Sequence, residues 1–303
     1  MRYTRIEEIP PLRDPVLLVA FAGWNDAASA ATAAGKALIE KLAARYFAAI
    51  DGEEFYDFTS TRPIVDVKGD AQVSLEWPSN SFYYHADPAL ERDIIVFMGA
   101  EPQLKWRTFT GEFLDLARQC GVGLVVTLGA MLTDAPHSRA VPISGFATDQ
   151  TLVERLRALQ INPISYQGPT GILGVIHNIC LRREMPSLSL WASVSHYLGI
   201  AENPKAAAAL VHVLDDLLGL RLDLEDLDQT ARRFESQVDA IVSRSIEAAA
   251  YVKELERRAD AVLQSQTRAG GERAELPPSE VLIKDLEEFL KRRRAQGSNG
   301  DDS

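Results

Sequence analysis

The chain has 303 residues, 46% of them hydrophobic and 25% charged, and its 43 acidic and 32 basic side chains give a net charge of −11. This composition is typical of a soluble globular protein with one large domain, or with a domain and an accessory unit. The negative charge argues against general binding to nucleic acid or to anionic membranes, because phosphate groups would be repelled.

Targeting and redox signals are few. The first 14 residues lack the apolar core of a signal peptide, and no window reaches the ~18 consecutive apolar residues of a membrane span. Cys120 and Cys180 are far apart and show no CxxC spacing, which predicts reduced thiols. We therefore expect a soluble, cytoplasmic protein.

The first two hundred residues alternate between apolar runs that end in glycine turns and segments typical of helices. The runs 15–23, 93–102, 123–132 and 187–198 are predicted strands, and 26–44, 105–120 and 148–159 are predicted helices. Between them, residues 52–87 contain short aromatic pieces that favour hairpins, either at a sheet edge or as a flap. This alternation predicts an α/β domain over residues 1–200.

The composition changes after Ile200. An alanine-rich helix is predicted from Asn203-Pro204 to about residue 218, with Gly219 as its cap. A second, long helix over 224–262 carries an apolar seam of heptad type, which requires a partner helix. Residues 201–265 are thus predicted to form a helical hairpin or extension. Residues 266–303 are predicted to be a mobile tail with a short amphipathic helix after Ser279.

The corner after the first predicted strand consists of Gly23, Trp24, Asn25 and Asp26. A strand end that leads into a helix N-terminus can bind an anion. The corner nevertheless lacks the glycine spacing of both the dinucleotide-binding motif and the P-loop. We favour the alternative in which Asn25 or Asp26 caps the helix, and we expect Trp24 to meet another surface.

Two later corners also carry polar side chains. Glu101 could act as a general base with Arg107 as an anion clamp, but a carboxylate that favours a helix start is the preferred interpretation. Asp134, His137 and Arg139 lie in a turn-rich loop, 127–149, without a metal-site motif or a G-x-S-x-G nucleophile motif. For that loop, a surface or interface role is the leading interpretation, and a Ser–His–Asp triad is the alternative.

A fourth corner places Thr170 and Gly171 in a glycine-rich segment ahead of His177. The glycines could open an anion-binding helix start, or they could allow tight packing around a hydrogen-bonded core histidine. His196 is more typical of a structural histidine. No motif in the chain indicates a cofactor or a metal ion.

Several segments together resemble the proteasome assembly chaperone 2 family, in its bacterial branch, over residues 15–262. They are AFAGWNDAASAATAA, FMGAEPQLKWR, TLGAMLTDAPHSR, GPTGILGVIHNICLRREMPSLSLWASVSHYL and NPKAAAALVHVLDDLLGL. The resemblance implies an α/β/α sandwich similar to the purine nucleoside phosphorylase-like fold, with a C-terminal helical addition. It also implies scaffolding of proteasome α-rings by oligomers, without an established catalytic residue set.

Family members that engage the proteasome often end in a hydrophobic–Tyr–any tripeptide. The printed chain ends in Asp301-Asp302-Ser303, so that feature is absent from it. The resemblance therefore leaves the partner open.

Two functions follow as hypotheses. The leading one is a non-enzymatic assembly-chaperone-like or interaction protein that acts as a homo-oligomer, with a trimer as one candidate and proteasome subunits as candidate partners. The alternative is a protein that binds or converts a nucleoside, a phosphate or a carboxylate at its strand-end loops. Its lining candidates are Asn25, Asp26, Glu101, Asp134, His137 and Thr170.

Overall fold

The computed structural model describes residues 2–68, 72–164, 166–199 and 202–269, without the side chains of 66–68, 72–73 and 265–269. The strands are β1 Thr4–Ile6, β2 Val16–Ala22, β3 Arg45–Ile50, β4 Ile64–Lys68, β5 Gln72–Glu76, β6 Ser81–His85, β7 Ile94–Ala100, β8 Leu124–Thr133, β9 Ile143–Ala147, β10 Asn162–Pro163 and β11 Ser187–Ser195. The α-helices are α1 Ala30–Lys41, α2 Trp106–Gln119, α3 Gln150–Ala158, α4 Ile172–Arg182, α5 Pro204–Leu218, α6 Glu225–Val242 and α7 Ile246–Ala269, with 3-10 turns at Ala27–Ser29 and His196–Leu198.

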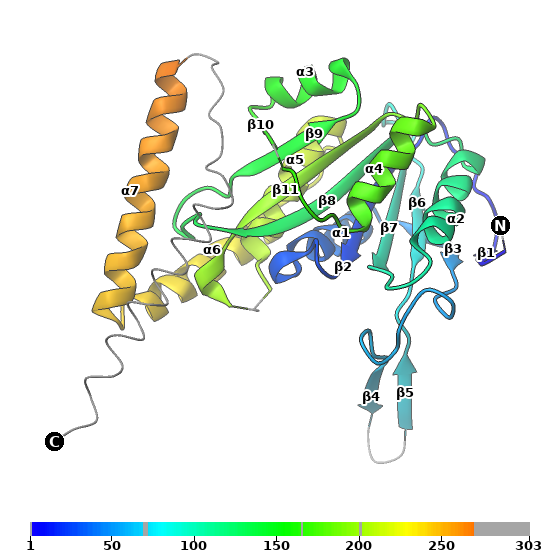
Figure 1. The fold of residues 1–303 in the computed structure, drawn as a ribbon, viewed down its shortest axis with the longest axis horizontal. Coiled ribbons are helices and arrows are strands. Elements are labelled where there is room, and N and C mark those ends of the chain that lie inside the picture. The colour runs from blue at the N-terminus through cyan, green and yellow to red at the C-terminus, as the bar shows by residue number, and fades with distance from the viewer. Residues whose placement is uncertain (1, 69–71, 165, 200–201, 270–303) are drawn as a thin grey trace. The chain divides into compact units, whose positions relative to one another are not determined.

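Nine of the described strands form one mixed sheet in the order β1-β3-β6-β7-β2-β8-β11-β9-β10 (Figure 1). The four central strands, β7, β2, β8 and β11, are parallel to one another. At one side, β6, β3 and β1 continue the sheet in antiparallel fashion, and at the other side β9 is antiparallel to β11. A mixed α/β fold with C-terminal helices is therefore observed.

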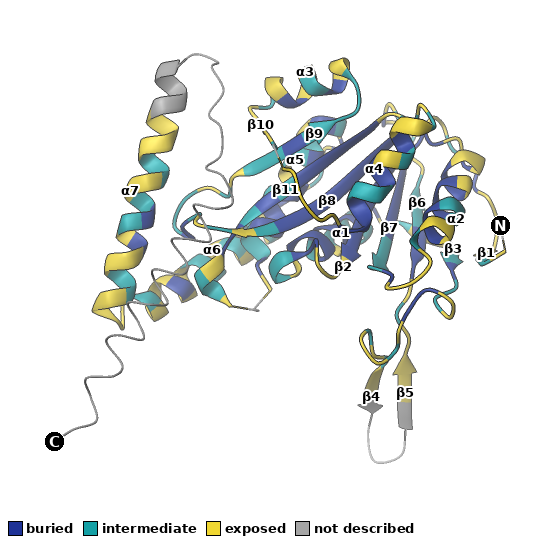
Figure 2. Ribbon diagram, viewed as in Figure 1, coloured by how far each residue is buried: buried dark blue, intermediate teal, exposed yellow. Residues whose placement is uncertain are grey.

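Helices cover both faces of this sheet because its central strands alternate between two apolar cores. In β2, Val16 and Leu18 pack with α1 and α5, whereas Leu17 and Val19 pack with α2 and α4. Such continuous burial explains why β2 is apolar at every position. Figure 2 shows the central strands as the buried part of the molecule.

The core under α2 and α4 is rich in phenylalanine. The Phe97 ring lies 4.7 Å from that of Phe82, 4.9 Å from Phe21 and 5.0 Å from Phe113, measured between centroids. All four side chains are almost fully buried. The rings tie β2, β6 and β7 to α2, and so fix the strand ends at which the candidate site is built.

The predicted strands and helices of the first two hundred residues are present with small shifts at their ends. The predicted helix 26–44 is shorter than expected: a 3-10 turn at Ala27–Ser29 precedes α1, and Arg45–Ile50 is a strand. The pattern of residues 52–87 allowed an extension of the sheet or a separate hairpin, and both are present. The strand β6 joins the sheet, and β4 and β5 form a separate two-stranded ribbon. Cys120 and Cys180 are buried free thiols.

The prediction of one long helix over 224–262 was wrong, because the chain turns at Ser243–Ser245 between two helices, α6 and α7. The Ser245 hydroxyl accepts a hydrogen bond from the Ala248 N–H at 3.2 Å, as a helix N-cap does. Asn203 and Gly219 cap α5 as predicted. The domain boundaries at residues 200 and 265 stay a prediction, and most of the predicted tail, residues 270–303, lies outside the described residues.

Candidate functional site

Three of the predicted corners, the first, the second and the fourth, meet beyond the carboxyl ends of the central strands β2 and β7. β2 and β7 are neighbouring parallel strands, so the residues that follow them emerge side by side. Glu101 directly follows β7, and its N–H donates to the Ala22 carbonyl at 2.8 Å. Gly171 immediately precedes α4 and lies against Asn25 and Glu101. We call Trp24, Asn25, Glu101, Gly171 and Ile172 the Glu101 corner.

The Glu101 carboxylate holds this corner together. Its Oε1 accepts hydrogen bonds from the Ile172 N–H at 2.8 Å and from Asn25 Nδ2 at 3.3 Å. Its Oε2 accepts from the Trp24 N–H at 3.2 Å. Ile172 is the first residue of α4, so the carboxylate occupies the positive end of that helix. A side chain of the protein thus fills the place where a bound anion was considered.

Two glycines permit this close approach. Gly23 has φ +131°, which side chains rarely allow, and a Cβ there would lie 3.0 Å from the Glu101 Cβ. A Cβ at Gly171 would lie 2.2 Å from Asn25 Nδ2 and 2.7 Å from Glu101 Oε1. Gly23 and Gly171 are therefore explained by packing around one carboxylate.

Asp26 has a structural role in the same turn. Its carboxylate accepts from the N–H groups of Ala31 and Thr32, at 2.7 and 3.3 Å, and from the Thr32 hydroxyl at 2.5 Å. Asp26 is buried, and burial raises the pKa of its carboxyl above the ordinary value. The N-cap position of α1 is Ser29, so Asp26 secures the first turn of α1 from outside the cap position that the sequence predicted for it.

Trp24 is the side chain of the corner that remains open to solvent. Its backbone is held by Glu101, whereas 64% of its surface is exposed. Leu104, which also follows β7, is 47% exposed. Thr170 is exposed as well, and its hydroxyl donates to the Gly171 carbonyl at 3.4 Å. The exposed Trp24 ring thus lies beside a carboxylate that is already hydrogen-bonded within the protein.

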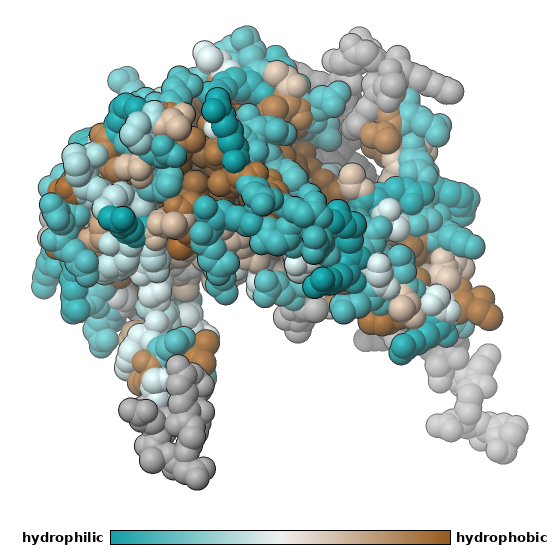
Figure 3. Space-filling view, turned by 180° about the vertical axis from the view of Figure 1, so that it is seen from behind, coloured by the Kyte–Doolittle hydropathy of each residue, from teal (hydrophilic) through white to brown (hydrophobic). Residues whose placement is uncertain are grey.

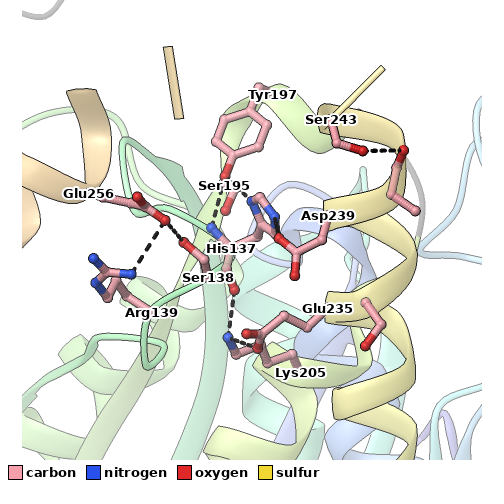
Figure 4. A network of polar contacts seen from close by, with 12 residues as sticks. His137, Ser138, Arg139, Ser195, Tyr197, Lys205, Glu235, Asp239, Ser243 and Glu256 are labelled. Carbon is pink, nitrogen blue, oxygen red and sulfur yellow. Dashed lines mark hydrogen bonds and ion pairs between the residues drawn. The ribbon is translucent and has the colours of Figure 1, made fainter. Parts of the chain in front are cut away.

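The polar side chains of the third predicted corner do not join this group: they contact the C-terminal helices and the 3-10 turn His196–Leu198 (Figure 4). Ser138 and Arg139 both bind the Glu256 carboxylate on α7, Arg139 at 3.3 Å. Asp134 pairs with His196 at 3.3 Å. The loop therefore serves as an attachment site for α7.

His137 is the centre of this attachment. Its side chain is 1% exposed, and its Nε2 lies 3.0 Å from Asp239 Oδ1 on α6. Its Nδ1 lies 2.6 Å from the Tyr197 hydroxyl, which also accepts the His137 N–H at 2.8 Å. These distances fit one set of hydrogen bonds, in which the Tyr197 hydroxyl donates to His137 Nδ1 and the His137 Nε2–H donates to Asp239. The Lys205 ammonium binds the His137 carbonyl at 2.5 Å and pairs with Glu235 on α6.

His177 lies in the core rather than at a binding surface. Its Nε2 is 2.8 Å from the Thr127 hydroxyl and its Nδ1 is 2.9 Å from the Ser187 hydroxyl. The Ser189 hydroxyl continues this network. Burial lowers the pKa of His177 to about 4. The packing interpretation of the fourth corner therefore accounts for this histidine, and the neutral ring stabilises the fold.

Two surface cavities of the described residues lie elsewhere. One of about 350 Å³ is lined by Glu7, Tyr46 and Tyr84 among others, and one of about 160 Å³ by Arg92 and Arg155 among others. Neither contains a residue of the four predicted corners. Within the described residues, no cluster of three His, Cys, Asp or Glu side chains could hold a metal ion.

No helix in the described part of the chain is long and apolar enough to cross a membrane.

Sequence reasoning missed Tyr197, Lys205, Asp239 and Glu256 as partners of the third corner. Each lies at least 60 residues from its contact in that loop. Tyr197 stood beside His196 in a predicted strand and Lys205 beside the Asn203-Pro204 helix start, but neither signal indicated a contact with the loop. A local pattern cannot reveal pairs that only the tertiary fold brings together.

Comparison with known proteins gives a family and a set of related structures. The PAC2 family model matches residues 20–242. A PAC2 family protein from Streptomyces avermitilis is 39% identical over 79% of this chain and 100% of its own, with a TM-score of 0.71. The Mycobacterium tuberculosis proteasome-assembly chaperone homologue Rv2125 is 35% identical over 78% of this chain and 99% of its own, with a TM-score of 0.70.

A more distant structure shares the fold alone. PbaB of Pyrococcus furiosus, described as an archaeal proteasome activator, is 22% identical, with a TM-score of 0.64 over 80% of this chain and 99% of its own. No curated protein matches the chain.

Proposed function

The chain belongs to the PAC2 family, and we propose that it is a non-enzymatic, assembly-chaperone-like protein that binds other proteins through the exposed surface of the Glu101 corner. A relative that is 35% identical is described as a proteasome-assembly chaperone homologue. By transfer from it, proteasome subunits are the first candidate partners. Self-association into a homo-oligomer is part of the same proposal.

One observation carries this proposal: the donors at the corner are already used by the protein itself. The Ile172, Asn25 and Trp24 donors all point to Glu101. A phosphate or carboxylate ligand would compete with Glu101 for those donors, and its negative charge would lie beside the Glu101 charge. Trp24, by contrast, offers the exposed aromatic surface that is typical of protein interfaces.

The proposal also includes the purine nucleoside phosphorylase-like fold that the sequence resemblance implies. A mixed sheet with helices on both faces supports this assignment. Fold likeness alone brings no catalytic activity, because activity depends on the site. The paired state of Glu101 therefore favours the interaction role over the small-molecule alternative.

The test is a binding titration with purified proteasome α-subunits from the same organism. We expect the wild-type chain to bind, and Trp24→Ala to lose about 2 kcal/mol of binding free energy, or roughly a 30-fold increase in Kd, as for an aromatic hot spot. Leu181→Ala is the matched control, because Leu181 on α4 is 58% exposed and lies outside the corner.

Equal affinity for the wild-type chain and Trp24→Ala would show that the corner is not the interface. Failure of the wild-type chain to bind would refute proteasome subunits as partners.

A further inference from the structure

Carboxylates attach the last two described helices to the rest of the chain. We call residues 230–259, which comprise most of α6 and the part of α7 up to residue 259, the strap. In three places a strap carboxylate accepts from the loop after β8 or from α5 (Figure 4): Asp239 from His137, Glu256 from Ser138 and Arg139, and Glu235 from Lys205. The strap thus supplies the acidic partner in each of these contacts.

Apolar packing holds the strap less firmly than it holds the neighbouring helix α5. Three apolar side chains of the strap are buried, Val238, Val252 and Leu255, and none of them belongs to either core of the sheet. By comparison, the 15 residues of α5 bury seven side chains. Ile241 and Ile246 are 64% and 90% exposed, and Figure 3 shows hydrophobic side chains on the surface of the C-terminal helices. The strap therefore depends on its polar contacts.

The first turn of α6, which precedes the strap, is fixed in a different way. Leu224 is buried in the core beneath α1 and α5, and Leu227 packs against that core. In the same turn, Asp226 pairs with Lys41 on α1. Both apolar and charged contacts anchor this turn, so it can stay in place when the strap moves.

The polar contacts of the strap are partly open to solvent. The Asp239 side chain is 59% exposed, and those of Arg139 and Glu256 are 41% and 24% exposed. Salt screens charges that solvent reaches, and the Debye length falls from about 10 Å at 0.1 M to about 3 Å at 1 M. The attachment of the strap therefore weakens as the ionic strength rises, whereas burial in the apolar cores is not screened.

The strap lies at a distinctive end of the sheet. His137 and Arg139 follow β8 and His196 follows β11, and these two neighbouring strands are parallel. The strap reaches both, because the Tyr251 hydroxyl lies 3.0 Å from His196 Nε2. Open α/β sheets bind their ligands outside the carboxyl ends of their strands. The strap thus covers a part of the molecule where such folds place binding surfaces.

We propose that the strap is a releasable cover, which its carboxylates hold over the carboxyl ends of β8 and β11 and which opens when these contacts are screened. Opening exposes the loop that carries His137 and leaves the sheet and the first turn of α6 in place. The released helices lose the tertiary packing that supplies most helix stability in proteins, so they also fray. This surface is separate from Trp24, and the inference does not depend on the proposed function.

Hydrogen exchange of the full chain, followed by mass spectrometry at about 0.1 M and about 1 M sodium chloride, tests the release. We expect the amides of residues 246–259 to exchange about tenfold faster at the higher concentration, because screening favours the open state. The amides of α2, which packs on the sheet through its apolar side chains, serve as the internal reference and should keep their rates.

Two variants of α7 separate release of the strap from a general effect on the helix. Glu256→Gln removes the charge that binds Arg139, so the amides of 246–259 should exchange about fivefold faster at low salt. Glu254→Gln is the matched control, because Glu254 pairs with Arg257 and Arg258 of α7 itself. We expect the control to exchange at nearly the wild-type rate.

Three outcomes would overturn the proposal. The first is equal exchange of residues 246–259 in the wild-type chain at both salt concentrations. The second is exchange in Glu256→Gln that is no faster than in Glu254→Gln. The third is acceleration of α2 by the same factor as the strap, which would indicate loss of the whole fold. Binding through Trp24 is measured separately, so its failure would leave this result unchanged.

Discussion

Replacing Glu101 by alanine is expected to lower the free energy of unfolding by about 3 kcal/mol, since three N–H donors then lose a charged acceptor. Asn25 and Ile172 are buried, so their donors cannot simply turn to bulk water. The Trp24 N–H is nearer to solvent and contributes less to the loss. Urea denaturation at pH 7 measures the change.

Two controls separate the charge of Glu101 from its shape. Glu101→Gln keeps one acceptor oxygen but places an amide donor among donors, so we expect an intermediate loss of stability. Formate or acetate should stabilise Glu101→Ala and leave the wild-type chain unaffected, because only the variant has vacant donors at the start of α4. An alanine variant as stable as wild type, or wild-type stabilisation by these anions, would contradict the role given to Glu101.

His177 is expected to make the fold sensitive to acid. Its pKa of about 4 in the folded chain lies below the ordinary value near 6.5, because the buried ring avoids charge. Between these two pH values the unfolded chain takes up a proton and the folded chain does not. Its contribution to stability is therefore complete above pH 6.5 and falls by about 3 kcal/mol as the pH drops to 4.

Urea denaturation between pH 7 and pH 4 measures this loss, with His177→Gln as the comparison. The variant lacks the titrating ring, so its stability should fall about 3 kcal/mol less over the same range. Burial raises the pKa of Asp26, so its protonation favours the folded chain as the pH falls. Both proteins contain Asp26, so this effect cancels when their stabilities are compared. Parallel pH profiles would contradict the assignment of the acid sensitivity to His177.

The sequence was informative wherever a local pattern determined the structure. The apolar runs of β2, β7 and β8 are buried on both faces, and such runs have few alternatives to a covered parallel strand. The Ser243–Ser245 turn was missed because the seam was followed through it, although Ser245 is a common capping residue. The strand β3 was also missed, since Arg45 and Tyr46 at its start gave no apolar run.

The individual residues of the candidate site could be predicted from the sequence, but the contacts between them could not. Gly23, Glu101 and Gly171 each stood at a recognisable corner, and an anion at the helix start was a reasonable hypothesis. That the anion is Glu101 itself depends on β2 and β7 being neighbours, which local spacing does not contain. The same limit hid the contacts of His137 and Arg139 with the C-terminal helices.

The exposed surface beside Glu101 is proposed to contact another protein. A photo-crosslinking amino acid at position 24, introduced into the full chain in its own cells, tests this directly. We predict a discrete crosslinked product with another polypeptide from position 24, and none from the exposed control position 181. The absence of any crosslink from position 24, or the same products from both positions, would contradict the claim.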